Sequence, residues 1–288
     1  MRVRFLGTAA GGGLPQWNCA CEGCTRARRE GTARTQDCLA VSGDGSAWYL
    51  LNTSPDLRTQ LLNAPELTPS QGLRVSPIRG VLFTSAELDH TLGLFTLREA
   101  DQLAVYGTRP VLAAIPAAQV IGNYSTVDWR TISCGVPFEL DGGLTATAFL
   151  CSAKRPRYAQ EGESQDWVIG YRVVGAADDR VLVYAPCLAL WPPRFAAIIA
   201  DADLVVLDGT FFHSDEMARR TGLDRPASSM GHLPIEATLP LIRDISGPRY
   251  TYTHLNNTNP LAHPDAPEHE LLTAVGADVA PEAGLIQL

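Results

Sequence analysis

The stretch from residue 80 to residue 97 limits the possible folds of this chain more than any other. An apolar run at 80–83 is followed by Thr-Ser-Ala-Glu-Leu-Asp-His-Thr-Leu-Gly at 84–93, and apolar residues then recur at helical spacing. The pattern predicts a strand, a turn and a helix, with Asp89 and His90 in the turn. Because open α/β sheets bind ligands at such strand ends, we expect a sheet that carries acidic and imidazole groups at this edge.

Apolar runs of strand length recur along the chain, and helical periodicity separates them in each half. Strands are predicted at residues 3–6, 39–41, 48–51, 81–83, 104–106, 144–150, 167–174, 181–184, 204–207 and 250–253. Helices are predicted at residues 55–62, 90–100, 110–121, 188–200, 234–243 and 267–274. This order favours a four-layer αββα sandwich, an α/β (α+β) fold with two mixed sheets face to face, over a doubly wound sheet. Since no linker or charge block divides the chain, we expect a single domain over residues 1–288.

The composition argues against several classes of partner. A net charge of -8 and a pI near 5.2 disfavour binding to nucleic acid or to an anionic membrane. No run of eighteen apolar residues occurs, and the N-terminal residues enter a strand pattern directly, so neither a membrane span nor a signal peptide is predicted. The seven cysteines are an odd number, which is typical of reduced thiols in the cytoplasm rather than of a disulfide framework.

Three of these cysteines, Cys19, Cys21 and Cys24, form a C-x-C-x-x-C motif in a predicted loop after the first strand. Three thiolates at this spacing can converge on one structural Zn²⁺, with a fourth ligand from elsewhere. A chance cluster of thiols is the alternative, and a redox pair is less favoured because no thioredoxin-like βαβ unit follows. The fourth ligand is not evident, since Cys38 lies in a strand pattern where a buried cysteine is usually core.

The remaining candidates for metal binding are histidines. His254 ends the predicted strand at 250–253 and precedes a polar loop, whereas His232 is expected to open a helix. His263 and His269 lie in a Pro-rich acidic tail and are expected to be solvated. Taken alone, each histidine is better explained by a structural role. A strand-terminal His254 together with the Asp89–His90 pair is a stronger candidate set.

Residues 85–90 resemble the H-x-H-x-D-H metal motif of the metallo-β-lactamase superfamily, which implies the αββα sandwich. The first two histidines of that motif are replaced here by Ser85 and Glu87. The bridging aspartate of the superfamily is replaced at Cys187, and no histidine occurs at 149–154. A hydrolytic centre with two metals needs these ligands to hold its nucleophile, so it cannot assemble in its usual form.

The resemblance leaves Asp89, His90 and His254 as metal ligands. Two histidines and one carboxylate with open positions are typical of mononuclear non-heme Fe(II) oxygenases. Ser85 and Glu87 are then expected to line the lost metal position, and His232 to move protons near it. Glu87 is equally well explained as a hydrogen-bond acceptor that orients a ligand.

Longer motifs make the chain similar to one family, the pyrroloquinoline quinone (PQQ) synthesis protein B family. They lie at residues 5–19, 33–36, 52–58, 87–99, 208–210, 230–232 and 253–260. The resemblance is strong to Pro260 and fades in the acidic tail. It implies a cytoplasmic protein on the pathway to PQQ, which starts from a peptide in which a glutamate and a tyrosine are cross-linked.

Three functions of different kinds follow from this resemblance. The first is an Fe(II)-dependent oxygenase that hydroxylates the tyrosine ring of the precursor, and the second is a soluble carrier of PQQ or its precursor towards the periplasm. The third, a metal-dependent hydrolase, is disfavoured by the lost ligands. A precursor with several carboxylates needs cations, and the candidates are Arg34, Arg58, Arg98 and Arg155.

Overall fold

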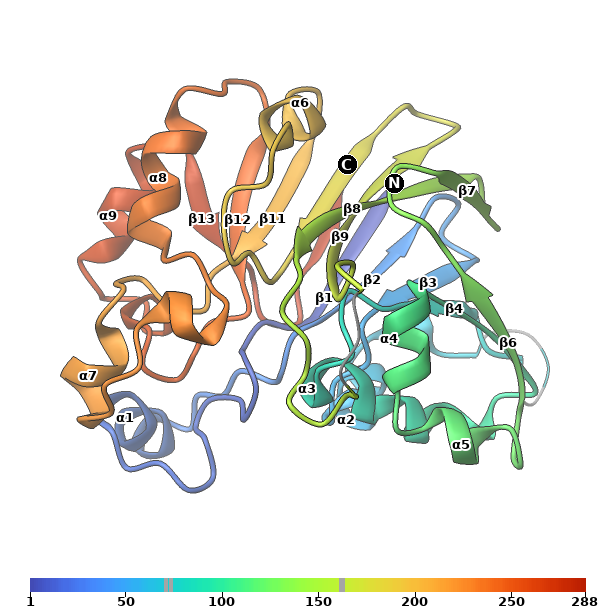
Figure 1. Cartoon of the computed structure of the whole chain (residues 1–288), viewed down its shortest axis with the longest axis horizontal. Coiled ribbons are helices and arrows are strands. Elements are labelled where there is room, and N and C mark those ends of the chain that lie inside the picture. The colour runs from blue at the N-terminus through green and yellow to red at the C-terminus, as the bar shows by residue number, and fades with distance from the viewer. Residues whose placement is uncertain (70–71, 73–74, 161–163) are drawn as a thin grey trace.

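The structure is a computed structural model and describes residues 1–69, 72, 75–160 and 164–288 (Figure 1). Within these residues the strands form two seven-stranded mixed sheets. The sheets pack face to face, and helices α8 and α9 lie on one outer side while α2 to α5 lie on the other (Figure 1). The predicted four-layer αββα sandwich is therefore confirmed, and the doubly wound sheet is excluded.

The first sheet contains both parallel and antiparallel pairs. The four consecutive strands β3 to β6 pair in parallel. The remaining pairs, from β14 through β1 and β2 to β3, are antiparallel. In spatial order the strands are β14 (Leu285–Gln287), β1 (Arg2–Gly7), β2 (Cys38–Ser42), β3 (Trp48–Leu51), β4 (Ile78–Leu82), β5 (Gln102–Gly107) and β6 (Thr126–Thr131).

The second sheet repeats this division. The pairs from β10 to β13 are parallel, and those from β7 to β10 are antiparallel. In spatial order the strands are β13 (Ala277–Val279), β12 (Arg249–Thr253), β11 (Leu204–Asp208), β10 (Val181–Ala185), β9 (Val168–Gly175), β8 (Leu144–Ser152) and β7 (Pro137–Leu140).

The central strands are apolar on both faces because each face is covered. In β2, Leu39 and Val41 join the core between the two sheets, whereas Cys38 and Ala40 join the core under the helices. This alternation is the two-residue period of a strand. It confirms that Cys38 is a core residue, with no exposed surface.

Three of the predicted helices are confirmed: α2 (Leu57–Leu62), α8 (Ile235–Arg243) and α9 (Glu268–Thr273). The helix predicted at 90–100 is instead a short α3 (Leu88–Thr91) that continues as the 3₁₀ helix η2 (Leu92–Glu99).

Prolines explain two further differences. Residues 110–121 form two helices, α4 (Arg109–Ala114) and α5 (Ala118–Ile121), because Pro116 lies between them. At 188–200 only α6 (Phe195–Ile199) forms, since Pro192 and Pro193 precede it.

The four strands that the sequence did not predict are β6, β7, β13 and β14, and each stands at an edge of its sheet. Edge strands are half exposed and carry polar residues, so they lack the apolar run that identifies a central strand. The unpredicted helices are short: α1 (Glu22–Glu30), α7 (Glu216–Thr221), η1 (Pro65–Leu67), η3 (Ala227–Met230) and η4 (Pro260–Ala262). Among the described residues, no helix has the length and apolar character needed to cross a bilayer.

Candidate metal centres

Asp89, His90 and His254 come together where the two sheets meet. Asp89 and His90 lie in α3, after the end of β4, and His254 follows β12 directly. Asp89 Oδ2 is 3.2 Å from His254 Nε2 and 4.0 Å from His90 Nε2. His254 has a left-handed backbone, with φ of 59°, which is uncommon for a residue other than glycine and which turns the chain as it leaves the strand.

Hydrogen bonds fix the tautomer of His90, which is only 1% exposed. Its Nδ1 lies 2.9 Å from Ser85 Oγ and 3.2 Å from Thr84 Oγ1. Because the Thr84 hydroxyl donates its proton to Asn52 Oδ1, at 3.0 Å, it can only accept from His90. Nδ1 therefore carries the proton. Nε2 is left as a buried nitrogen that forms no hydrogen bond with any residue that the structure describes.

His254 is fixed in the same way. Its Nδ1 lies 2.8 Å from Thr210 Oγ1, and this hydroxyl donates to Asp208 Oδ1 at 2.7 Å. Nδ1 of His254 therefore donates, and Nε2 faces Asp89. Hydrogen bonds to the outer nitrogen orient metal-binding histidines in this manner.

The charges of this centre suit a cation. Burial alone would raise the pKa of Asp89, but His90 and His254 hold it well below its ordinary value. Burial lowers the pKa of His90 to about 4. For His254 burial acts in the same direction, yet the hydrogen bond that it donates to Asp89 raises its pKa to about 9. A proton on His254 therefore neutralises Asp89, and a metal ion can replace that proton. The three side chains fit a site for one divalent metal.

The sequence missed one further group in this centre. Cys187 Sγ lies within 4.8 Å of ligand nitrogens of both His90 and His254. Cys187 follows β10, whose end meets the end of β12 across β11. From the sequence the position is only that of a lost bridging aspartate, although its location after a strand is a signal that could have identified it as part of the centre.

His232 belongs to a second group with Asp208 and His254. Its Nδ1 is 2.8 Å from Asp208 Oδ2 and 3.0 Å from Thr210 Oγ1. It does not open a helix as predicted, because α8 begins at Ile235 and His232 lies in the preceding turn. Asp208 thus orients both imidazoles.

A pocket of about 700 Å³ opens onto these residues. Ser85 and Glu87 line it, and Ser85 also supports His90. Burial and the nearby Asp89 raise the pKa of Glu87. Three cations of one segment, Lys154, Arg155 and Arg157, also line the pocket.

Of the four arginines predicted to bind substrate, only Arg155 lines this pocket. Arg34 is directed elsewhere and donates to Thr8 Oγ1 at 2.8 Å and to the carbonyl of Ala280 at 3.3 Å. Arg58 is exposed on α2, and Arg98 pairs at the surface with Glu99. The spacing of residues along the sequence could not reveal where these arginine side chains point.

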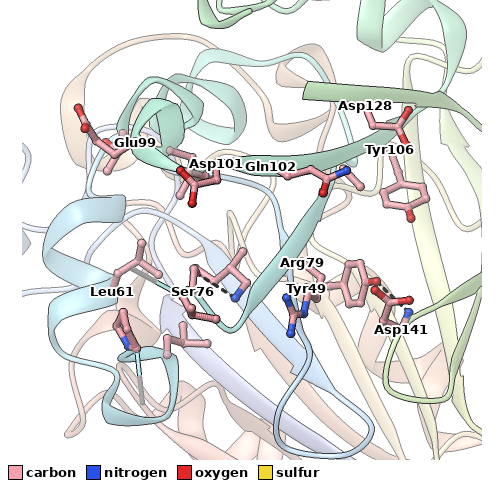
Figure 2. A pocket seen from close by; sticks show the side chains of 18 of the residues that line it. Tyr49, Leu61, Ser76, Arg79, Glu99, Asp101, Gln102, Tyr106, Asp128 and Asp141 are labelled. Atoms are coloured by element: carbon pink, nitrogen blue, oxygen red, sulfur yellow. Dashed lines mark hydrogen bonds between the residues drawn. The ribbon is translucent and has the colours of Figure 1, made fainter. Parts of the chain in front are cut away.

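A second pocket, of about 730 Å³, lies at β4 to β7 (Figure 2). Tyr49, Tyr106, Asp128 and Asp141 gather at one side of it. Arg130 pairs there with Asp128 and with the Tyr106 hydroxyl, both at 2.7 Å. None of its described lining residues belongs to a metal-ligating cluster, so we place the chemistry in the pocket above Asp89.

The three cysteines of the C-x-C-x-x-C motif also converge, with all three sulfurs within 4.8 Å of one another. Cys19 lies in a loop as predicted, whereas the other two cysteines belong to the start of a helix. Cys21 is the N-cap of α1, where its sulfur accepts from the Cys24 amide, and Cys24 lies within the helix. Burial, together with Cys21 and Cys19, raises the pKa of the Cys24 thiol to about 11. The three sulfurs, from one buried and two half-buried cysteines at a helix N-terminus, fit a zinc ion, which stabilises thiolates.

Of the other three histidines, His213 and His269 form hydrogen bonds within the protein. His213 Nδ1 lies 2.7 Å from Glu236 Oε2. The expectation that His263 and His269 are solvated is met only in part, because both side chains are half-buried. His263 Nε2 is buried without a hydrogen-bond partner among the described residues, and His269 Nε2 is 2.9 Å from the His263 carbonyl.

Comparison with known proteins defines the class first. The family described as "Beta-lactamase superfamily domain" matches residues 47–255. The crystal structure of a diphosphatase from the PhnP family superposes with a TM-score of 0.71 at 17% identity, covering 100% of this chain and 97% of the other, and shows the fold alone. The fold, the family match and the strand-end ligands define a metallo-β-lactamase-type protein.

Closer relatives define the family. Coenzyme PQQ synthesis protein B from Methylobacterium radiotolerans is 39% identical, with 97% of each chain covered. The protein of the same name from Azoarcus sp. is 36% identical over 100% of each chain. The crystal structure of Zn²⁺-bound PqqB from Methylobacterium extorquens superposes with a TM-score of 0.93 at 35% identity and covers 100% of both chains. This chain belongs to the coenzyme PQQ synthesis protein B family, and the likeness extends through the acidic tail, where we had expected it to fade.

Proposed function

We propose that this protein is a non-heme Fe(II)-dependent oxygenase in PQQ biosynthesis, which hydroxylates the tyrosine ring of a peptide-derived precursor. One observation carries the proposal: the Nε2 atoms of two histidines and one carboxylate face each other beside a pocket. This is the ligand set of mononuclear Fe(II) oxygenases. The family supports the pathway, since its members are named for PQQ synthesis.

Asp89, His90 and His254 would hold the iron, which when bound supplies the activation of O₂. Ser85 and Thr84 keep His90 in the tautomer that leaves Nε2 free. Each hydroxylation replaces a ring C–H bond with C–OH. The second oxygen atom leaves as water and takes two protons and two electrons from an external reductant.

The pocket supplies groups for the substrate. Lys154, Arg155 and Arg157 line it and can pair with the carboxylates of the cross-linked Glu-Tyr precursor. Nδ1 of His232 is hydrogen-bonded to Asp208, so a proton would pass between His232 and the pocket through Nε2. Glu87, whose pKa is raised, also lines this pocket and can hold a proton there.

We also propose that Cys19, Cys21 and Cys24 hold a structural zinc ion. The convergence of their sulfurs supports this assignment, and the relative from Methylobacterium extorquens is described as Zn²⁺-bound. In this proposal the two metal sites share no ligand.

The decisive experiment is anaerobic loading with Fe(II), exposure to O₂ with a reductant, and mass spectrometry of a tyrosine-containing precursor. We expect one added oxygen atom per hydroxylation, located on the ring. Zinc-loaded protein and an iron-loaded His254→Ala variant serve as controls and should give no product.

A soluble carrier of PQQ or its precursor is the second candidate, because the cations of the pocket would also bind the carboxylates of the finished cofactor. If iron-loaded protein adds no oxygen but binds PQQ tightly, and Lys154→Ala weakens that binding, the carrier function replaces the oxygenase. Rapid hydrolysis of a phosphodiester or lactam by the unmodified protein would contradict both.

A further inference from the structure

A tetrahedral zinc site needs a fourth ligand in addition to the three sulfurs of the cysteine cluster. The side-chain amide of Asn257 reaches all three. Its Nδ2 atom lies 3.3 Å from Cys19 Sγ and 3.4 Å from both Cys21 Sγ and Cys24 Sγ. We infer that Asn257 completes the site and binds zinc through its amide oxygen.

The distances match a tetrahedral vertex. With Zn–S bonds of about 2.3 Å and a Zn–O bond of about 2.1 Å, an oxygen ligand lies roughly 3.5 Å from each sulfur. The amide atom of Asn257 is almost equidistant from the three sulfurs and within about 0.2 Å of this value. An atom that only happened to lie near the cluster would be closer to one or two of the sulfurs than to the third.

The identity of the atom follows from the charge that it faces. The oxygen and nitrogen of an asparagine amide exchange places by a half-turn of the side chain, and hydrogen-bond partners decide between them. Towards sulfurs alone the NH₂ group is preferred. Towards a dication between the same sulfurs, the oxygen is the only atom of the amide that can bind.

Two other groups near the cluster are less suitable. His263 Nε2 is buried without a hydrogen bond to the described part of the chain, and it lies about 3.0 Å from the place where a Cβ on Gly23 would be. Yet His263 is not part of the metal-ligating group that the three cysteines form among the described residues. The backbone carbonyl of Asn257 is 3.9 Å from Cys21 Sγ, farther than the side chain.

This ligand would connect the zinc site to the segment that carries His254. Asn257 lies three positions after His254, whose left-handed backbone needs support. Leu255, between them, is held by hydrogen bonds of 2.8 Å to Thr8 and Ala10. Zinc bound to Asn257 would fix the other end of the segment. Asn257 is thus a zinc ligand and a positioning residue for His254.

Three variants test the ligand: Asn257→Ala, Asn257→Asp and the matched control Asn18→Ala, an exposed asparagine beside Cys19. Zinc affinity is measured by competition with a chromophoric chelator. We expect Asn257→Ala to weaken zinc binding about tenfold or more and Asn18→Ala to leave it unchanged. Asn257→Asp should retain or increase affinity because its carboxylate oxygen can bind zinc.

The aspartate variant separates a ligand from a hydrogen-bond donor. If the amide only donated to the thiolates, a carboxylate would repel them, and Asn257→Asp would bind zinc as weakly as Asn257→Ala or more weakly. That result, or unchanged affinity in Asn257→Ala, overturns the inference.

Wild-type protein provides a test that does not depend on folding of the variants. Zinc X-ray absorption should show three sulfurs and one oxygen, without the scattering pattern of imidazole. An imidazole or a fourth sulfur would overturn the assignment. These readouts measure zinc and are independent of any oxygenase activity.

Discussion

The two candidate metal centres of this protein are assembled in opposite ways. The cysteine cluster draws its sulfurs from six consecutive positions at the start of α1. In the centre at Asp89, the aspartate comes from one sheet and its partner His254 from the other, 165 positions along the chain. The first is a nearly closed site of soft ligands, and the second faces a pocket. Closed sites are typical of structural metals, and open positions are typical of catalytic ones.

The segment from His254 to Thr258 lies between the two centres. His254 faces Asp89, Asn257 faces the cysteine sulfurs, and Thr258 Oγ1 donates to Glu216 Oε1 at 2.5 Å. The comparison therefore predicts an asymmetry. Loss of a ligand in the open centre should leave zinc binding at the cysteine cluster unchanged. Loss of a cysteine ligand should also weaken metal binding at the open centre, because this segment connects the two.

The largest effect is expected for His254→Ala. Removal of one of three ligands should abolish iron retention and hydroxylation, because Fe(II) is low in the Irving–Williams order and binds weakly to incomplete sites. Zinc content should remain at the wild-type level. Metal analysis after dialysis, together with the mass-spectrometric assay, checks both. Loss of zinc along with iron would break the proposed separation of the two centres.

Cys21→Ser should lose zinc and lower stability. We expect a cost of about 2 kcal/mol or more, since metal binding contributes directly to folding, which corresponds to a Tm lower by roughly 4–8 °C. Iron affinity should fall as well, because residues 254–257 lose their anchor. Calorimetry and iron titration measure the two effects. An unchanged Tm with full zinc content would contradict the structural role, and Thr25→Ala on exposed surface of α1 is the control.

Ser85→Ala tests the support of His90 within the open centre. It removes the 2.9 Å contact to Nδ1 and leaves the Thr84 contact in place. Loss of such a partner weakens metal binding about tenfold, so iron affinity should fall while zinc affinity stays constant. Equal iron affinity in Ser85→Ala and wild-type protein would show that Thr84 alone fixes the tautomer.

Ser85→His combined with Glu87→His sharpens the comparison with hydrolytic relatives. Two imidazoles should restore uptake of a second divalent metal, measured by stoichiometry. Hydrolysis should remain low because Cys187 offers no bridging carboxylate. Fast hydrolysis by this variant would show that the bridging position is dispensable.

The smallest effect concerns pH. Burial raises the pKa of Glu216 from its ordinary value of 4.5 to about 7. The folded state therefore holds a proton that the unfolded state releases, so this contribution to stability is complete below pH 4.5 and is lost as the pH rises to 7. Glu216→Gln should flatten the dependence of Tm on pH over this range. A profile parallel to that of wild-type protein would contradict it.

Local patterns predicted much of the fold. Central strands such as β2 and β11 are covered on both faces, so their apolar runs were sufficient to identify them. The edge strands β6, β7, β13 and β14 were missed because pairing with a neighbour, rather than their own residues, makes them strands. The helix predicted at 188–200 was shortened to α6 by prolines whose effect outweighs apolar periodicity.

The residues of the candidate sites also fall into those that the sequence identified and those that only the structure placed there. The spacing of Cys19, Cys21 and Cys24 and the adjacency of Asp89 and His90 were visible in the sequence. His254 was found through its place after a strand and through the family resemblance. Cys187, Lys154 and Arg157 were not identified as parts of the site, and Arg34 was expected in a pocket that it does not line.

The sequence by itself determined which ligands stand close together along the chain, because spacing of a few residues limits the distance between side chains. Only the tertiary structure decided which distant groups meet. The directions of the side chains at 34, 187 and 257 depend on how two sheets pack and where each strand ends, and no local pattern contains that information. Asn257 shows this most clearly, since it lies 233 positions from Cys24 in the chain and 3.4 Å from its sulfur in space.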